Sequence, residues 1–456
     1  MTTVLRSVTL PDGTRTDLVM RDGLIVDDAG SGADVLDCDG LIALPGLVDV
    51  HTHLREPGRE DTETVLTGSR AAARGGFTAV CAMANTTPVT DTAEKAEHID
   101  DLGRRAGFVD VAVIGAISKG LAGQEPAELG LMNRSAARVT MFSDDGFCLM
   151  NAQLMRRALE WVKPFDGVIA QHSQDSNLAG PGACCHEGEL SGRLGLGGWP
   201  PVAESAIIAR DVQLAEAVGS RVHVCHVSTA EGVDVIRWAK ARGVRVTAEV
   251  TPHHLLLGTG ELVGYDTTFK VNPPLRTDEH IEAVRAALAD GTIDAVATDH
   301  APHATHDKDH AFVDARPGML GLEQALSVVL ETMLNPGRIG WETLAERMSH
   351  TPAGIAKLGG QGRPLGEVVH IQELAGVVEQ RAGGAQAVQG GDAGVRREVA
   401  VAAAADADAP ELQPAGLGQL LGLLKEGGLR QHHGLVHPAL DLQPDPGIDG
   451  PQGHDL

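Results

Sequence analysis

Two histidines separated by one residue, His51 and His53, close an apolar run in the segment VDVHTHLREPG, residues 48–58. Alternate residues of a β-strand point to the same face, so both rings can reach one ion while Thr52 points away. Histidine nitrogens are common zinc ligands. The spacing therefore indicates a metal site, and the alternative at this stage is a pair of solvated turn histidines.

Further candidate ligands stand at the ends of other apolar runs. His172 closes GVIAQHSQD, His226 closes RVHVCHVST, and Asp299 with His300 closes IDAVATDHAPH. A single histidine in a core is usually a hydrogen-bonded packing residue. The set made up of His51, His53, His172, His226 and Asp299, all at run-ends, is hard to explain in that way. These ligands suit zinc. Because they exceed the needs of one tetrahedral ion, we expect two zinc ions that share a bridging group.

The elements that must position these side chains follow a regular order along the chain. Apolar, β-rich runs end in polar residues, and helix-compatible stretches such as DTAEKAEHIDDLGRRAG lie between them. There are eight such runs: LVDVHTH, FTAVCAMANT, VDVAVIGAIS, RVTMFSDDG, GVIAQHSQD, RVHVCHVST, RVTAEVTPHH and IDAVATDHAPH. This alternation predicts an α/β fold, a (β/α)8 TIM-type barrel with its active site at the carboxyl ends of the strands. The alternative is a doubly wound open sheet, but no glycine-rich phosphate turn follows the first run.

The segments on either side of the predicted barrel, residues 47–360, have a different character. Residues 1–46 contain short runs separated by Asp-Gly turns, which predicts a small β-unit. Residues 361–456 form an atypical tail, which from Gly366 onward lacks aromatic residues, Ser, Thr and Asn. We expect this low-complexity tail to be partly disordered, although pieces such as REVAVAAAADADAP and GLGQLLGLLKEGGL are compatible with a weak strand or helix. An out-of-frame reading of the gene would explain the change of composition.

Composition narrows the possible partners and the compartment. A formal net charge of −25 argues against a nucleic-acid partner, which would require clustered Lys and Arg. The six cysteines form no CxxC pair, which favours free thiols. The sequence has neither a signal-peptide pattern nor a span of about 20 apolar residues. We therefore expect a cytoplasmic protein without a membrane partner.

Several motifs in fixed order resemble a known family. They are HTHLREPG, AMANTTPV, MFSDDG, QHSQD, CHVST, EVTPHH, NPPLR and ATDHAPH, spread over about residues 40–360. Together they resemble the amidohydrolase superfamily and, within it, the bacterial type I dihydroorotases. REPG after the histidine pair, with NPPLR and ATDHAPH, separates this family from the hydantoinases and allantoinases. The resemblance implies the barrel fold and a two-zinc site.

The resemblance also implies which residues hold the metals. Many relatives bridge the ions with a carboxylated lysine on the fourth strand, where this chain has MFSDDG and no lysine. By similarity the bridge is assigned to the second aspartate of that motif, and Asp144 is the alternative. The implied ligands are His51, His53 and Asp299 for the first zinc, His172 and His226 for the second, and Asp145 between them.

A substrate-binding set follows from the same resemblance. Arg55, Asn85 and His303 match groups that bind the substrate carboxylate, for which the planar fork of arginine is suited. Asn272 and the Pro317–Gly318 backbone match positions that touch the pyrimidine ring, and ordinary turn chemistry is the alternative for them. The complete implied set is His53, Arg55, Asn85, Asn272, His303, Pro317 and Gly318.

The implied activity is the reversible cyclisation of N-carbamoyl-L-aspartate to L-dihydroorotate and water, in pyrimidine (UMP) biosynthesis. In the hydrolytic direction a metal-activated water attacks the ring carbonyl, and Asp299 passes its proton to the departing nitrogen. Two alternatives stay open: another cyclic-amide hydrolase, such as a hydantoinase or allantoinase, and a non-catalytic partner of aspartate transcarbamoylase. We also expect a homo-oligomer, with aspartate transcarbamoylase as a possible partner of the active enzyme.

Overall fold

The computed structural model describes residues 2–21 and 24–361 together with two later strands, residues 376–378 and 399–403. Its centre is a sheet of parallel strands in sequential order, from β6 at one edge to β15 at the other. The eight strands are β6 (Leu47–Thr52), β7 (Phe77–Ala82), β8 (Asp110–Gly115), β9 (Met141–Phe142), β10 (Val168–Gln171), β13 (Arg221–Val224), β14 (Val246–Val250) and β15 (Ala295–Val296).

The two edges of this sheet meet beyond the end of β15. Thr52 and His300 form an isolated parallel bridge, and the backbone N–H of His53 donates to the carbonyl of His300 at 2.8 Å. The sheet is therefore a nearly closed barrel, and each strand corresponds to one of the eight runs identified in the sequence. This confirms the (β/α)8 prediction over the open sheet.

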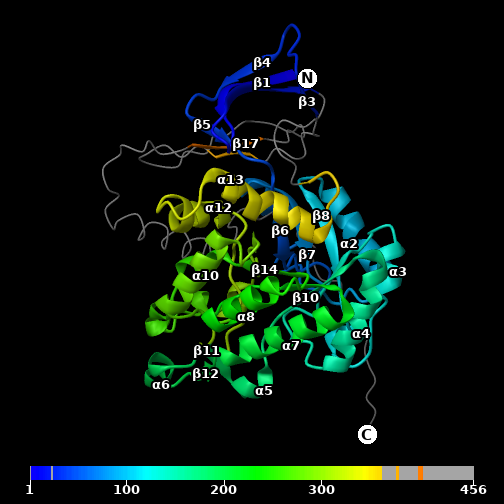
Figure 1. Cartoon of the computed structure of the whole chain (residues 1–456), viewed down its shortest axis with the longest axis vertical. Coiled ribbons are helices and arrows are strands. Elements are labelled where there is room, and N and C mark those ends of the chain that lie inside the picture. Colours follow the sequence, from blue (N-terminus) through cyan, green and yellow to red (C-terminus); the bar gives the residue numbers. More distant parts are fainter. Residues whose placement is uncertain (1, 22–23, 362–375, 379–398, 404–456) are drawn as a thin grey trace, which may run out of the picture.

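Helices follow the strands and cover the barrel (Figure 1). The charged segment that the sequence predicts as a helix is α2, which ends at Gly107 with φ of +68°. The longer helices are α1 (Val65–Arg74), α2 (Ala93–Ala106), α4 (Ala152–Val162), α7 (Val202–Val218), α8 (Ala230–Ala241) and α10 (Asp278–Asp290). The shorter ones are α3 (Leu129–Arg134), α5 (Ser176–Ala179), α6 (Glu189–Leu194), α9 (Pro252–Leu256), α11 (Thr305–Lys308), α12 (Ala325–Val329), α13 (Trp341–Ala345) and α14 (Thr351–Ala356).

The barrel strands are buried on both faces, which is why they appear as nearly continuous apolar runs. All six residues of β6 are buried. Val50, Ile114 and Ala170 belong to an inner cluster, whereas a larger cluster packs the outer faces of the strands against the helices. Asp49 and His51 interrupt the apolar run of β6 and are themselves fully buried. A buried charge in such a strand requires partners, and these lie at the site described below.

A second, mixed sheet precedes the barrel. It contains β1 (Thr2–Thr9), β2 (Arg15–Arg21), β3 (Leu24–Val26), β4 (Asp34–Asp37) and β5 (Leu41–Ala43). Two strands of the atypical tail join it: β16 (Gly376–Val378) pairs with β17 (Val399–Ala403), and β17 pairs antiparallel with β5. Of the strand or helix that REVAVAAAADADAP allows, the structure has a strand, β17. The rest of the tail lies outside the described residues, and the domain boundaries at 46/47 and 360/361 stay predictions.

The N-terminal sheet and the short ribbon of β11 (Ala183–His186) and β12 (Gly197–Trp199) lie at opposite ends of the molecule in Figure 1. The ribbon follows the carboxyl end of β10, whereas β5 leads directly into the start of β6. The small sheet is thus at the amino-terminal end of the barrel, away from the predicted active-site mouth. All six cysteines, which fall in the described ranges, are free thiols. Within those ranges, every helix is too short or too polar to span a bilayer.

Candidate metal centre

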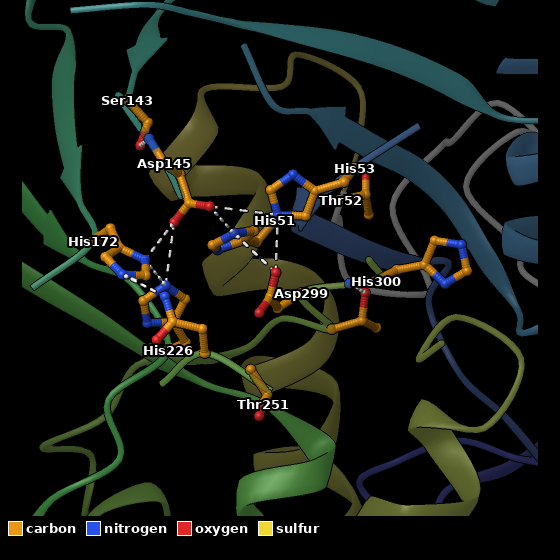
Figure 2. A network of polar contacts seen from close by, with 12 residues as sticks. His51, Thr52, His53, Ser143, Asp145, His172, His226, Thr251, Asp299 and His300 are labelled. Carbon is orange, nitrogen blue, oxygen red and sulfur yellow. Dashed lines mark hydrogen bonds and ion pairs between the residues drawn. The ribbon is translucent and has the colours of Figure 1, made fainter. Parts of the chain in front are cut away.

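Six of the side chains singled out in the sequence converge at the carboxyl ends of the strands (Figure 2). Each comes from a different strand or from the segment just after it, except that the first strand supplies two. His51 is the fifth residue of β6, and the others follow their strands by one to three residues. They are His51 and His53 at β6, Asp145 after β9, His172 after β10, His226 after β13 and Asp299 after β15.

The carboxylate of Asp145 lies between two groups of ligand atoms. Its Oδ2 is 3.5 Å from His51 Nε2 and 3.4 Å from His53 Nε2. Its Oδ1 is 3.2 Å from both His172 Nδ1 and His226 Nε2. Figure 2 shows the two oxygens directed to opposite sides. One carboxylate therefore faces two pairs of histidines at once, which is the arrangement of a bridging ligand.

The distances within each group fit a small divalent ion. Tetrahedral ligands at about 2.0–2.1 Å from zinc lie about 3.3 Å from one another. His172 Nδ1 and His226 Nε2 are 2.9 Å apart, and each is 3.2 Å from Asp145 Oδ1. The donor set of imidazole nitrogens and a carboxylate oxygen also suits zinc.

The other group contains a buried nitrogen that lies near two carboxylates but makes no hydrogen bond. Asp299 Oδ1 is 3.4 Å from His51 Nε2 and 2.9 Å from His53 Nε2, which completes a set of two histidines and two aspartates. His51 Nε2 is buried and has no hydrogen-bond partner among the described residues. A buried polar atom without a partner is costly, and a coordinated cation would satisfy it. The residues of both groups therefore fit metal ions.

Outer partners fix the orientation of the rings. His51 Nδ1 lies 2.6 Å from Glu249 Oε1, and His53 Nδ1 lies 2.9 Å from Asn85 Oδ1. His172 Nε2 lies 2.7 Å from Gln174 Oε1. If each of these nitrogens donates, the opposite nitrogen of the same ring is left as a lone-pair ligand. This is the usual arrangement around metal-bound histidine.

Electrostatics in the cluster favour positive charge. Burial lowers the pKa of His51, but Asp145, Glu249 and Asp299 outweigh burial and raise that pKa well above its ordinary value. Burial raises the pKa of Asp145, but His51 and the hydrogen bonds from His172 and His226 hold it well below its usual range. The field that favours a proton on His51 also favours a divalent cation, which displaces protons from its ligands.

Three residues of the site have left-handed backbone conformations. Arg55, His226 and Asp299 have φ of +62°, +34° and +47°. Such values cost side chains with a Cβ about 1–3 kcal/mol each and concentrate at functional sites. Here they occur at two of the metal-site residues and at the proposed substrate arginine. The backbone therefore carries strain at the points where these side chains are directed into the mouth.

The two neighbouring aspartates of MFSDDG have separate environments. Asp144 accepts hydrogen bonds from the backbone N–H groups of Ile117 and Ser118, at 2.8 and 2.9 Å, and from the Ser118 hydroxyl at 2.5 Å. Its carboxylate is thus engaged in holding the loop after β8, and it is absent from the clusters of potential metal ligands in the described ranges. The geometry favours Asp145 over Asp144 as the bridge.

A cationic side chain, Arg55, lies close enough to the metal cluster for Asp299 and Asp145 to affect its pKa. Arg55 Nε donates to the carbonyl of Pro302 at 3.0 Å, and its terminal nitrogen is 3.4 Å from His303 Nε2. Burial, followed by the charge of Arg59, lowers the pKa of Arg55 to about 10, so it remains protonated at neutral pH. Burial, then Arg55 and Lys308, lower the pKa of His303 to about 3, so this ring is neutral. Of this pair, Arg55 therefore carries the positive charge and His303 is neutral.

The remaining predicted substrate residues surround the same region. Asn85 contacts the metal-site ring of His53, and Asn272 Nδ2 lies 3.2 Å from His172 Nε2. The carbonyl of Pro317 lies 2.7 Å from His303 Nε2. Gly318 has φ of +145°, and a Cβ there would stand 2.7 Å from His303 Nε2, so only glycine fits. The structure brings all the predicted site residues together at one mouth.

Sequence reasoning missed the residues that support the ligands. Glu249 in β14 is fully buried and accepts from His51 through one oxygen and from His223 Nε2 at 2.9 Å through the other. Burial raises its pKa, but His51 and His223 lower it to about 2. Asp49 holds the backbone N–H groups of His51 and Thr298. A charged residue in the middle of a buried run, as in TAEV and LVDV, is the signal that could have identified both.

The other cysteine and histidine motifs stay apart from this centre. Cys184, Cys185 and His186 lie in the short strand β11 and occur in no candidate metal cluster within the described ranges. Three further histidines, His432, His433 and His437 in QHHGLVH, lie outside the described residues.

The fold and the site together define a class. A parallel eight-stranded barrel with histidines and aspartates clustered at the carboxyl ends of its strands is the architecture of the metal-dependent hydrolases of the amidohydrolase superfamily. The family profile described as "Dihydro-orotase-like" matches residues 40–232.

Curated relatives narrow the family to which the chain belongs. It is 61% identical over 369 residues to a dihydroorotase of Leifsonia xyli subsp. xyli, covering 80% of this chain and 84% of that protein. It is 53% identical over 359 residues to a dihydroorotase of Mycobacterium tuberculosis, covering 78% and 83%. The chain belongs to the dihydroorotase family, which confirms the resemblance seen in its motifs.

Solved structures share the fold at lower identity. An L-hydantoinase (dihydropyrimidinase) from Arthrobacter aurescens aligns with a TM-score of 0.69 at 24% identity, covering 79% of this chain and 84% of that one. A dihydropyrimidinase from Brevibacillus agri NCHU1002 aligns with a TM-score of 0.68 at 20% identity, covering 80% and 84%. At this level of identity, the similarity supports the fold alone.

Proposed function

We propose that this chain catalyses the reversible cyclisation of N-carbamoyl-L-aspartate to L-dihydroorotate and water at a centre of two zinc ions. The observation that carries the proposal is the position of Asp145, whose two oxygens face separate histidine pairs at 3.2 to 3.5 Å. The first ion would be held by His51, His53, Asp145 and Asp299, and the second by Asp145, His172 and His226. When bound, such a metal pair lowers the pKa of a water to near neutrality and polarises a carbonyl group.

Asp299 is the proposed proton carrier. Its Oδ1 is held 2.9 Å from His53 Nε2, at the edge of the cluster that faces the mouth. Burial raises the pKa of Asp299, but His51 and His53 lower it below its ordinary value. Asp299 is therefore ionised at neutral pH and able to accept a proton. In the hydrolytic direction it takes a proton from the attacking water and passes it to the departing ring nitrogen, and in the biosynthetic direction the transfer is reversed.

Arg55 and its neighbours are suited to bind a substrate that carries a carboxylate. The guanidinium of Arg55 is fixed through Nε to the Pro302 carbonyl, which leaves its terminal nitrogens for an anion. His303 lies 3.4 Å from this group and 2.7 Å from the Pro317 carbonyl, and Asn85 contacts His53 at the metal ligands. Asn272 and the Pro317–Gly318 backbone would contact the ring.

The same features separate this activity from the alternatives. A neutral cyclic amide such as hydantoin has no carboxylate to pair with Arg55, so its binding would leave a partly buried charge uncompensated. A non-catalytic role would not require ligand atoms at metal-binding distances in both groups. Dihydroorotase activity is therefore the function that the site supports best, in agreement with the names of the similar curated proteins.

The test is turnover by the purified full chain supplied with zinc. We expect hydrolysis of L-dihydroorotate, little hydrolysis of hydantoin or allantoin, and close to two zinc ions per chain by elemental analysis. Asp299→Asn should abolish turnover. Asp290→Asn is the matched control, because Asp290 forms a surface ion pair with Arg237 and belongs to neither group of metal ligands. Hydantoin turnover above that of dihydroorotate would contradict the proposal.

The expected associations are proposals of the same kind. We propose a homo-oligomer in the cytoplasm, with aspartate transcarbamoylase as a possible partner. Light scattering of the purified chain, alone and mixed with aspartate transcarbamoylase, measures both associations. A monomer that does not change mass in the mixture would contradict them.

A further inference from the structure

Lys308, the last residue of α11, donates its ammonium group to three backbone carbonyls. Its Nζ lies 2.7 Å from the carbonyl oxygen of Gly318, 3.1 Å from that of Thr267 and 3.3 Å from that of Lys270. An ammonium has three donors and no acceptor, so these contacts use its full hydrogen-bonding capacity. Lys308 thus joins three chain segments that are separate in sequence.

Two of these segments carry proposed substrate-binding groups. Gly318 belongs to the loop whose backbone is proposed to contact the ring, and Lys270 stands two residues before Asn272. Further bonds complete the arrangement: Gly318 N donates to the Lys270 carbonyl at 2.9 Å, and His303 Nε2 lies 2.7 Å from the Pro317 carbonyl. The polar backbone groups of this loop are therefore held from several sides. Lys270 Nζ donates to the Val313 carbonyl at 2.9 Å, and Lys308 is the charged donor to the Gly318 carbonyl itself.

Holding a lysine in this position has an electrostatic cost. Burial, followed by the nearby charge of Lys270, lowers the pKa of Lys308 to about 8. The charged and titratable groups that face it are Lys270 and Arg55, which lower its pKa, Asp266 and Asp307, which raise it, and His303. An uncharged side chain would avoid this cost. A charged donor here instead strengthens the bond to the Gly318 carbonyl.

We propose that Lys308 is a positioning residue for substrate binding, which holds the Pro317–Gly318 backbone against His303 and thereby sets its distance from Arg55. The inference rests on the proposed function, because it assigns Lys308 to the pocket for the substrate's ring and carboxylate. Lys308 touches backbone rather than reacting atoms, so its effect is expected in binding. The metal cluster does not contain it.

Steady-state kinetics of Lys308→Met test the proposal. We expect KM for L-dihydroorotate to rise about 10-fold or more, with a smaller change in kcat and an unchanged zinc content, because one charge-assisted bond to the Gly318 carbonyl is lost. The matched control is Lys163→Met. Lys163 Nζ also donates to a backbone carbonyl, that of Val218 at 2.6 Å, but ahead of β10 at the other end of the barrel. Its KM should equal that of the parent.

The pH profile adds a readout that a purely structural role would not change. Lys308 is charged below a pH of about 8, so KM of the parent should rise as pH passes upward through this value. The profile of Lys308→Met should be flat in that range, and Lys308→Arg, which keeps its charge, should restore part of the binding without a rise near pH 8. An unchanged KM in Lys308→Met, or a loss confined to kcat, would overturn the proposal.

Amide hydrogen exchange separates failure of this inference from failure of the proposed function. Peptides that cover residues 304–320 should exchange faster in Lys308→Met than in the parent, because the bond from Gly318 N to the Lys270 carbonyl opens more often when Lys308 no longer holds the loop. This measurement requires no turnover. A parent chain without activity would count against the proposed function, and equal exchange in the two chains would count against the role of Lys308.

Discussion

Replacement of Glu249 by glutamine tests whether the buried residue beneath His51 supports the metal centre. The carboxylate accepts from His51 at 2.6 Å and from His223 at 2.9 Å, each through its own oxygen. A glutamine offers one acceptor and one NH2 group, so one imidazole N–H would face a donor. An unpaired buried donor costs about 1–3 kcal/mol. Loss of an outer partner of a ligand histidine reduces metal affinity about 10- to 100-fold, or about 1.4–2.7 kcal/mol.

The assay is a competitive zinc titration with a chromophoric chelator, accompanied by thermal melting with and without zinc. For Glu249→Gln we expect one of the two sites to weaken by 10- to 100-fold and the melting temperature to fall. Glu282→Gln is the control, because its exposed carboxylate pairs with Arg338 at 2.6 Å and such pairs contribute at most about 1 kcal/mol. Equal zinc affinity in Glu249→Gln and the parent would refute the reasoning that Glu249 orients His51 for coordination.

Three further outcomes follow from the same geometry. Asp145→Asn should reduce the zinc content and lower turnover at least about 100-fold, whereas Asp144→Asn should keep its zinc and lose about 1–3 kcal/mol of stability, as elemental analysis and thermal melting would show. Gly318→Ala should raise KM about 10-fold with the fold retained, because its Cβ would stand 2.6 Å from the carbonyl of Ala301 and 2.7 Å from His303 Nε2; an unchanged KM would count against that contact. Removal of zinc by a chelator should abolish turnover and lower the unfolding free energy by about 2.7 kcal/mol for each site that was saturated at 100 times its Kd, and added zinc should restore both. A melting curve that chelation leaves unchanged would contradict metal binding.

The fold was predictable because the barrel repeats one local pattern. Each strand is buried on both faces, so each appears in the sequence as an apolar run, and its polar end marks the mouth. His51 and His53 could be recognised because a strand places alternate residues on one side. The closing bridge between Thr52 and His300 could not be predicted in this way, because it depends on the path of the chain beyond β15.

The site was predictable only at the level of its ligands. Glu249 and Asp49 look like interruptions of apolar runs until the structure brings Glu249 to His51 and His223. Sequence similarity named Asp145 over Asp144, but the physical distinction is the three hydrogen bonds by which Ile117 and Ser118 engage Asp144. The tail strand β17 was also hard to predict. Its residues have only a weak propensity for β-structure, and they form a strand by pairing with β5.

The buried carboxylates of the site make metal binding by the barrel depend on pH. Asp145, Asp299 and Glu249 lie in or next to the barrel interior, where an uncompensated carboxylate is costly. A proton on His51 compensates part of this negative charge, because the three carboxylates raise the pKa of its ring. A proton on His51 and a divalent cation at its Nε2 exclude each other, so acidification should compete with metal binding. Zinc affinity should therefore fall as the pH is lowered, and the same carboxylates that hold the ion would then be held by protonated histidine.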